Sequence, residues 1–390
     1  MNGFNFHDIH ALHVDTNANL WFSMYNSVYR FNPGSRQIPT KVFEASPTNS
    51  IITLFEDPFS NIWAGTFGEG IYIIDKQTSR MRHITHSDGL PDENIISLTG
   101  DSAHICIATL GGVAACRLPG NPLDQPLTLN QVDIGQGSGL DINYLYDIYK
   151  DSRGELWFAT DGSGIISYHN GNTQTYLGDE EPGRQVMLTI TEDRSGNLWF
   201  ASATNGIYRF DGSGFMRYGT EEGLRDLAIT TIILDREDNL LMLNKSGIDI
   251  LDIENGHFSY LDPQFGDQQN EFFLNAVGQD PQGNIWMGSE KGIVKFACLP
   301  DAFFSGPKTV IDRVKIIYED FDFRNQTLLE YQQNYLIFHF SAIWYQHLEA
   351  VSFQYQLEPH DPGWFTTSSR EVSYSGLAPG HYTFKVRSAV

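Results

Sequence analysis

The chain has 390 residues and carries 25 Lys and Arg against 48 Asp and Glu, so its net charge of −23 disfavours binding to nucleic acids and to anionic lipid surfaces. Hydrophobic residues make up 41% of the chain and charged residues 19%, which excludes an intrinsically disordered protein. The 36 Gly residues and the aromatic content of 13% favour β-strands joined by tight turns, and no apolar segment approaches the length that crosses a membrane.

One pattern recurs seven times in the first 300 residues. Each copy has an apolar run, an Asp, a short polar turn, Asn-Leu-Trp or a variant of it, a second turn that usually contains Gly, and an apolar strand. The leading aspartates lie 42 to 50 residues apart, which is the period of a four-stranded propeller blade. The pattern therefore predicts an all-β fold with a closed, seven-bladed β-propeller over residues 1–305. The seven aspartates are Asp15, Asp57, Asp101, Asp151, Asp193, Asp235 and Asp280.

We interpret the repeated residues as architecture rather than chemistry. Each Asp is expected to cap the turn that follows it, and each Trp to fill the wedge between neighbouring blades, where a large flat ring buries the most area. The Trp residues are Trp21, Trp63, Trp157, Trp199 and Trp286, with Cys106 and Leu241 in the equivalent place of the third and sixth copies. Three cysteines cannot form a disulfide framework, so Cys106, Cys116 and Cys298 are expected to be buried thiols, a pair between Cys106 and Cys116 being the alternative.

From about residue 310 the period stops and five strand-like segments follow, separated by polar turns. This pattern is typical of a small immunoglobulin-like β-sandwich, here over residues 310–390 and without its final strand. The last residues, YTFKVRSAV, stop within a strand-like run, and the first, MNGFNFHDIHALHVD, lack the pattern of a signal peptide. We therefore expect the chain to be a piece of a longer protein.

The repeat resembles that of the two-component regulator propellers. The segment FQYQLEPHDPGWFTTSSREVSYSGLAPGHYTFKVR resembles the triple-tyrosine domain that follows such propellers, with Tyr355, Tyr374 and Tyr382 at its three named tyrosines. Trp364 also fits the pattern of that domain, and we expect Trp364 and Tyr374 to lie in the core of the sandwich or at its contact with the propeller.

The resemblance implies the sensor region of a membrane-anchored, often hybrid, histidine kinase. Such regions lie in the periplasm and respond to carbohydrates, commonly oligosaccharides. The implied partners are an oligosaccharide ligand and a second copy of the chain, bound through the C-terminal region. The implied membrane contact and kinase activity belong to segments that this chain does not contain. No cofactor, no catalytic residue and no nucleic acid are implied for the chain itself.

The loops that precede the first strand of each blade vary in length, and the turns after each Trp are expected at the same end of the propeller. Variable loops on a rigid scaffold are where binding residues concentrate, and the amides and aromatic rings found there suit a neutral or weakly charged sugar. The candidate ligand-binding residues are His7, Tyr25, Asn49, Phe67, Glu69, Asn94, Asn143, Tyr144, Asp161, Gln185, Asn205, Arg225, Lys245, Asn270 and Lys291.

Two other classes of function stay open. Glu69 and Asp161 could form a carboxylate pair of a propeller lyase or hydrolase acting on polysaccharide, and a scaffold that binds only protein partners is also compatible with the fold. The spacing of His7, His10 and His13 resembles a zinc motif, but residues three apart on a strand point to opposite faces, so no metal site is predicted.

Overall fold

The computed structural model describes residues 6–35, 37–134, 144–177, 185–261, 271–296, 308–317, 319–323, 328–343 and 352–389. The chain divides into two compact units, Met1–Cys298 and Leu299–Val390, and each unit is treated by itself below. Nowhere in the described ranges is a helix both long enough and apolar enough to cross a membrane.

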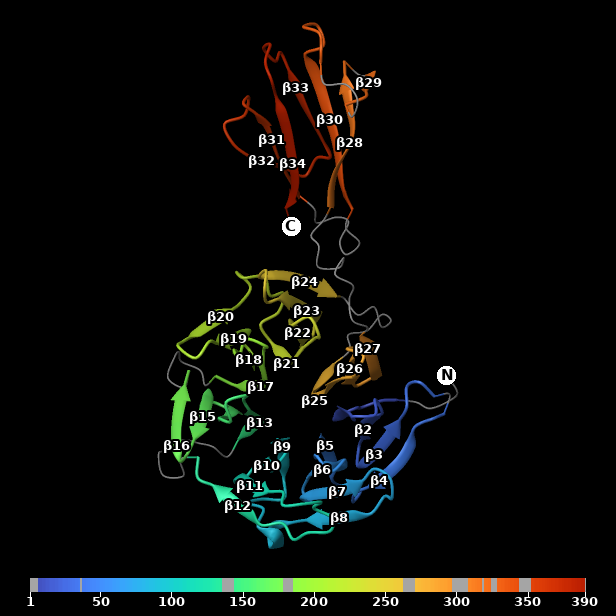
Figure 1. Ribbon diagram of the computed structural model, residues 1–390, viewed down its shortest axis with the longest axis vertical. Coiled ribbons are helices and arrows are strands. Elements are labelled where there is room, and N and C mark those ends of the chain that lie inside the picture. Colours follow the sequence, from blue (N-terminus) through green and yellow to red (C-terminus); the bar gives the residue numbers. More distant parts are fainter. Residues whose placement is uncertain are drawn as a thin grey trace. The chain divides into compact units, whose positions relative to one another are not determined.

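The described strands of the first unit form seven antiparallel sheets arranged around one axis (Figure 1). Six sheets have four strands and the seventh has three described strands, which confirms the predicted all-β propeller of seven blades. The first three blades contain β1 (Leu12–Val14), β2 (Leu20–Met24), β3 (Ser27–Phe31), β4 (Thr40–Glu44); β5 (Ser50–Glu56), β6 (Asn61–Phe67), β7 (Ile71–Asp75), β8 (Met81–Ile84); and β9 (Ile95–Gly100), β10 (His104–Thr109), β11 (Gly112–Arg117), β12 (Leu129–Val132). A 3-10 turn, η1 (His86–Asp88), follows β8.

The other four blades continue the same order from the axis outward. They contain β13 (Leu145–Lys150), β14 (Leu156–Thr160), β15 (Ile165–His169), β16 (Asn172–Tyr176); β17 (Met187–Glu192), β18 (Leu198–Ser202), β19 (Ile207–Phe210), β20 (Phe215–Tyr218); β21 (Ile229–Leu234), β22 (Asn239–Asn244), β23 (Gly247–Asp252), β24 (His257–Leu261); and β25 (Phe272–Gln279), β26 (Ile285–Ser289), β27 (Gly292–Phe296).

The ring closes between the first and seventh blades. The inner strands β1 and β25 contact each other, as do the inner strands of the other neighbouring blades. The N–H groups of Asp8 and Ile9 also donate to the carbonyl oxygens of Glu290 and Ser289, at 2.9 and 3.1 Å. The segment before β1 therefore joins the first blade to the seventh through backbone hydrogen bonds.

Each repeated Asp fixes the turn between the first two strands of its blade. In five blades the Trp indole N–H donates to the Asp Oδ2 at 2.9 to 3.1 Å. In the fifth blade the Oδ1 of Asp193 also accepts the backbone N–H groups of Ser195 and Asn197, and the Asn197 side chain donates to both oxygens. These carboxylates are buried with their partners, which confirms the structural role predicted for Asp and Trp.

The Trp rings fill the wedges between blades. Trp63 of the second blade packs with Ile95, Leu98 and Ile105 of the third, and the other Trp rings lie in equivalent clusters. In the third blade Cys106 takes this place and packs with residues of the fourth.

Cys106 and Cys116 are free, and burial raises the pKa of each thiol to about 11, as expected for buried thiols. Cys298 lies outside the described residues.

The second unit is a two-sheet sandwich. One sheet has the order β29-β28-β30-β33 and the other β32-β31-β34, and the core between them includes Phe338, Phe340, Phe353 and Leu357. The strands are β28 (Lys308–Ile316), β29 (Glu319–Phe321), β30 (Tyr335–Ile343), β31 (Ser352–Glu358), β32 (Phe365–Thr367), β33 (Glu371–Ser375) and β34 (Thr383–Ala389).

Of the two sandwich aromatics singled out from the sequence, Tyr374 lies in the core as predicted, whereas Trp364 lies outside the core. Tyr374 is 9% exposed, and its hydroxyl donates to Asp361 Oδ2 at 2.6 Å. Trp364 is 41% exposed and its ring packs under the guanidinium of Arg387, 4.4 Å from the ring centroid. The difference arises because Trp364 lies in the turn before the short edge strand β32, where a side chain has the sheet on one side only.

We expect Asp193→Ala to lower the free energy of unfolding by about 3 kcal/mol, because it leaves the buried indole N–H of Trp199 and the turn amides without an acceptor. Thermal and urea unfolding would measure the change. Asp211→Ala is the matched control in the same blade, because Asp211 caps an exposed turn through Ser213 and Gly214 and its loss should lower the stability much less. Equal losses for the two variants would contradict the role assigned to the buried Asp.

Candidate functional site

The loops that precede the first strands and the turns after the Trp positions lie at one end of the propeller, which we call the variable face. Phe67 pairs with Asn94, and Asp161 pairs with Val186, each in an antiparallel bridge between a turn and the leading loop of the next blade. Similar backbone hydrogen bonds join Ile51 to Tyr25 and Gly206 to Leu227. The turns and leading loops therefore form one continuous surface.

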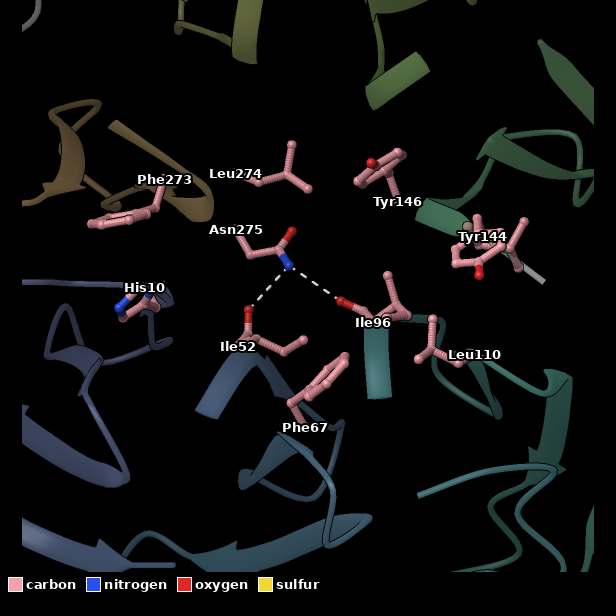
Figure 2. A pocket seen from close by; sticks show the side chains of 11 residues that line it. His10, Ile52, Phe67, Ile96, Leu110, Tyr144, Tyr146, Phe273, Leu274 and Asn275 are labelled. Carbon is pink, nitrogen blue, oxygen red and sulfur yellow. Dashed lines mark hydrogen bonds between the residues drawn. The ribbon is translucent and has the colours of Figure 1, made fainter. Parts of the chain in front are cut away.

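A pocket of about 430 Å³ opens at the axis of the propeller on this face (Figure 2). We call it the axial pocket. Its walls come from five blades and are mainly apolar and aromatic, with few polar groups. The lining residues are His10, Ile52, Phe67, Ile96, Leu110, Tyr144, Leu145, Tyr146, Phe273, Leu274 and Asn275.

One side of the axial pocket exists because the seventh blade departs from the repeat. Along β25 the pairing passes from Phe272 opposite Ser289 to Val277 opposite Met287, so several residues of β25 bulge out of the ladder. In the other blades that carry a bulge on the first strand, the register shifts by a single residue, as between Leu145 and Asp147. The larger bulge of β25 contributes Phe273, Leu274 and Asn275 to the pocket.

The side chain of Asn275 crosses from the seventh blade to the second and third. Its Nδ2 donates to the carbonyl oxygens of Ile52 at 3.0 Å and Ile96 at 3.2 Å, and Figure 2 shows both hydrogen bonds at the centre of the site. A parallel bridge between Asn275 and Ala11 adds a contact to the first blade. This single residue therefore connects four blades at the axis.

Of the predicted ligand-binding residues, Phe67 and Tyr144 line the axial pocket, and they are 45% and 56% exposed. The other lining residues were missed, because most of them lie in or beside apolar strands whose sequence reads as buried core. His10 was considered only as a metal ligand. The signal for Asn275 is an amide inside an apolar run, FFLNAV, where a strand buried on both faces would hold no polar side chain.

Two further predicted residues form a small cluster on the variable face. The rings of His7 and Tyr25 contact each other edge to face, with centroids 5.2 Å apart, and His7 Nδ1 lies 3.1 Å from Asp8 Oδ2. A hydrogen bond to Asp8 raises the pKa of Tyr25. Tyr25 is 54% exposed, so its ring is accessible to a ligand.

Several predicted polar residues are engaged within the loops themselves. Glu69 accepts hydrogen bonds from the hydroxyl and N–H of Ser46, and these bonds lower the pKa of its carboxyl despite partial burial; Asn49 also bonds to it.

The side chain and N–H of Asn94 donate to Asp92 Oδ1. The side chain of Gln185 is buried, and its Oε1 accepts no hydrogen bond from the described residues. Asn205 accepts a hydrogen bond from Arg217 through its carbonyl oxygen.

The predicted cations have different environments. The guanidinium of Arg225 pairs with buried Asp249 at 2.7 Å and lies 4.9 Å from the ring centroid of Tyr260, so Arg225 contributes to the scaffold. Lys245 lies 3.9 Å from Glu271, and the side chain of Lys245 is exposed, as is that of Lys291. Asn143 and Asn270 lie outside the described residues.

The three histidines of the zinc-like spacing contact different groups: His7 contacts Tyr25, His10 contacts the ring of Phe273 at a tilted angle, and His13 lies 3.7 Å from Glu56. Among the residues that the structure describes, no group of three or more His, Cys, Asp or Glu side chains could hold a metal ion.

The opposite end of the propeller axis has a second opening, of about 560 Å³, lined in part by Asp15, Glu56, Asp57, Asp101 and Asp280. Asp15, Asp57 and Asp280 hold the indole groups described above, so these carboxylates serve the scaffold. Glu56 pairs with buried Lys76 and accepts hydrogen bonds from Thr16. Burial opposes its ionisation, but the interactions with His13 and Lys76 outweigh burial and lower the pKa of Glu56 to about 2. We therefore take the axial pocket as the candidate site.

Two family models match parts of the chain. Residues 139–162 match the two component regulator propeller, and residues 345–389 match the Y_Y_Y domain, which confirms the resemblance inferred from the repeat and the tyrosines. No significant sequence match to a curated protein is found.

Solved structures support the fold. The extracellular domain of a protein described as a hybrid two component system from B. thetaiotaomicron is 22% identical, with a TM-score of 0.67 over 100% of this chain and 54% of that chain. This chain thus spans about half of that domain. A virginiamycin B lyase from Staphylococcus aureus is 15% identical, with a TM-score of 0.60 over 75% of this chain and 96% of that chain. The WD40 propeller domain of Doa1 is 13% identical, with a TM-score of 0.54 over 78% and 97% of the two chains. At these identities the three structures show that this chain shares the propeller fold, which occurs in an extracellular domain, a lyase and a WD40 protein alike.

We expect Glu56 to stabilise the folded chain by about 3 kcal/mol at neutral pH, because its pKa is lower in the folded state than in the unfolded state. A lowered carboxyl pKa gives stability that is present above about pH 4.5 and is lost as the pH falls toward 2. Urea unfolding of the wild type and Glu56→Gln between pH 3 and 7 would show a gap that narrows as the pH falls. A gap that does not change with pH would contradict the assignment.

Proposed function

We propose that the chain is the ligand-sensing region of a two-component sensor and that it binds a neutral or weakly charged oligosaccharide on the variable face, over the axial pocket. The observation that carries this proposal is the open pocket with the exposed rings of Phe67 and Tyr144 at its walls. Aromatic rings pack against the C–H faces of sugars, while the surrounding loops offer amides and hydroxyls for the sugar edges.

The proposed location is the periplasm, as for the sensor regions that the sequence resembles. The proposal includes a homodimer formed through the C-terminal sandwich and a histidine kinase in the rest of the full-length protein. The similarity to an extracellular domain of a two component system supports the location and the signalling role.

We propose binding without turnover. The carboxylate of Glu69, which the sequence offered as one half of a catalytic pair, is held ionised by the hydroxyl and N–H of Ser46. A general acid for glycoside cleavage needs a raised pKa, so the environment of Glu69 disfavours this role. Chromatography of sugars recovered after incubation tests the enzyme alternative, and a shortened sugar would overturn this part of the proposal.

We expect isothermal titration calorimetry against a panel of neutral and sulfated oligosaccharides to give binding by neutral members. Tyr144→Ala and Phe67→Ala should each weaken that binding about tenfold, because each removes an exposed ring from the site. Tyr331→Ala is the matched control, since Tyr331 is an exposed aromatic residue of the sandwich, 77% accessible.

Binding by the sulfated sugars alone would contradict the proposed ligand class. Unchanged binding in both pocket variants would contradict the proposed location of the site. Binding of a protein partner, with no binding to any sugar of the panel, would favour the scaffold alternative.

A further inference from the structure

The orientation of the Asn275 side chain in the axial pocket is fixed by its neighbours. Its Nδ2 faces the carbonyl oxygens of Ile52 and Ile96, at 3.0 and 3.2 Å. A carbonyl oxygen can only accept, so the nitrogen must lie on that side and the amide cannot flip. Figure 2 shows Oδ1 on the side away from the two carbonyls. Among the described residues no group donates to Oδ1, which leaves it as an acceptor for a ligand.

The walls around this acceptor are poorly suited to a group that carries many hydroxyls. Ile52, Ile96, Leu110, Leu145 and Leu274 offer no side-chain hydrogen bonds. Hydroxyls placed against them would lose their hydrogen bonds to water and gain none in return, which is unfavourable. The volume of about 430 Å³ is within the range of small-molecule sites.

The charges near the axial pocket disfavour an anion. Among the residues that the structure describes, the eleven that line the pocket include no Lys and no Arg. Burial raises the pKa of Tyr146, and the nearby carboxylate of Asp161, which would repel an anion, raises it further. Burial lowers the pKa of His10, so its imidazole is neutral at pH 7. A carboxylate or sulfate would therefore find no compensating positive charge among these side chains.

We infer that the axial pocket binds a neutral, mainly apolar group that ends in a hydrogen-bond donor, such as the ring and hydroxyl of a phenol. The donor would bond to Asn275 Oδ1, and the ring would pack against the apolar side chains that line the pocket. The inference rests on the proposed function, in which the surrounding loops hold the rest of the ligand. It makes Asn275 a residue that determines specificity, in addition to its contacts across the axis.

The test compares phenol, anisole and benzoate as probes by ligand-observed NMR titration of the whole chain. Anisole has the ring of phenol without the donor, and benzoate has the ring with a negative charge. We expect phenol to bind about tenfold more tightly than either, because a site with a fixed acceptor rejects a ring that has no donor. Leu110→Trp, which fills the pocket, should abolish phenol binding, while Tyr331→Ala should leave it unchanged.

Asn275→Leu should make phenol and anisole bind equally if the variant folds, which its thermal transition would show. If it does not fold, the comparison of probes on the wild type and on Leu110→Trp still decides the question. Equal binding of the three probes to the wild type, or phenol binding that persists in Leu110→Trp, would overturn the inference.

The experiments test the proposed function and the inference about the axial pocket separately. Oligosaccharide binding without any preference for phenol would overturn the inference and leave the proposed function in place. Phenol binding that is lost in Leu110→Trp, in a chain that binds no oligosaccharide, would support the inference about the pocket and overturn the sugar ligand.

Discussion

The hydrogen bond between a buried Asp and the indole of a Trp six residues later is the interaction on which the propeller depends. It occurs in five blades with nearly constant length. A buried carboxylate destabilises a protein unless its oxygens are fully hydrogen-bonded, and here the turn amides, an Asn side chain in most blades and the indole together satisfy it. The same bond sets the position of the ring that fills the wedge to the next blade, so one local turn determines packing between blades.

Because the wedges are filled in this way, the blades repeat closely and the residues at the variable face are free to differ. The candidate site arises where the repeat is broken. The bulge in β25 brings Phe273, Leu274 and Asn275 to the axis, and Asn275 then bonds to the second and third blades. A rigid ring with one irregular inner strand therefore gives a defined pocket at the axis of an otherwise regular scaffold.

The two ends of the propeller axis have different chemistry because different turns of the repeat lie at each end. The Asp turns bring carboxylates to one end, where they are held by indole groups and, at Glu56, by buried Lys76. The turns after the Trp positions bring aromatic and aliphatic residues to the other end, around Asn275. A neutral ligand is compatible with the second end, whereas the groups at the first end serve the scaffold.

The repeat in the sequence predicts the number of blades, the role of each Asp and Trp, and the face on which the variable loops gather, because these follow from local turns and from a period that each copy repeats. The sequence also drew attention to Phe67 and Tyr144, which line the axial pocket, because aromatic residues in loops stand out from the repeat. It did not distinguish Trp364, which lies outside the sandwich core, from buried Tyr374, since exposure at a sheet edge depends on which strand is the neighbour. Only the tertiary structure revealed Asn275 and the walls of the axial pocket, because residues 179 and 223 positions apart meet there through ring closure, and no local pattern records such a contact.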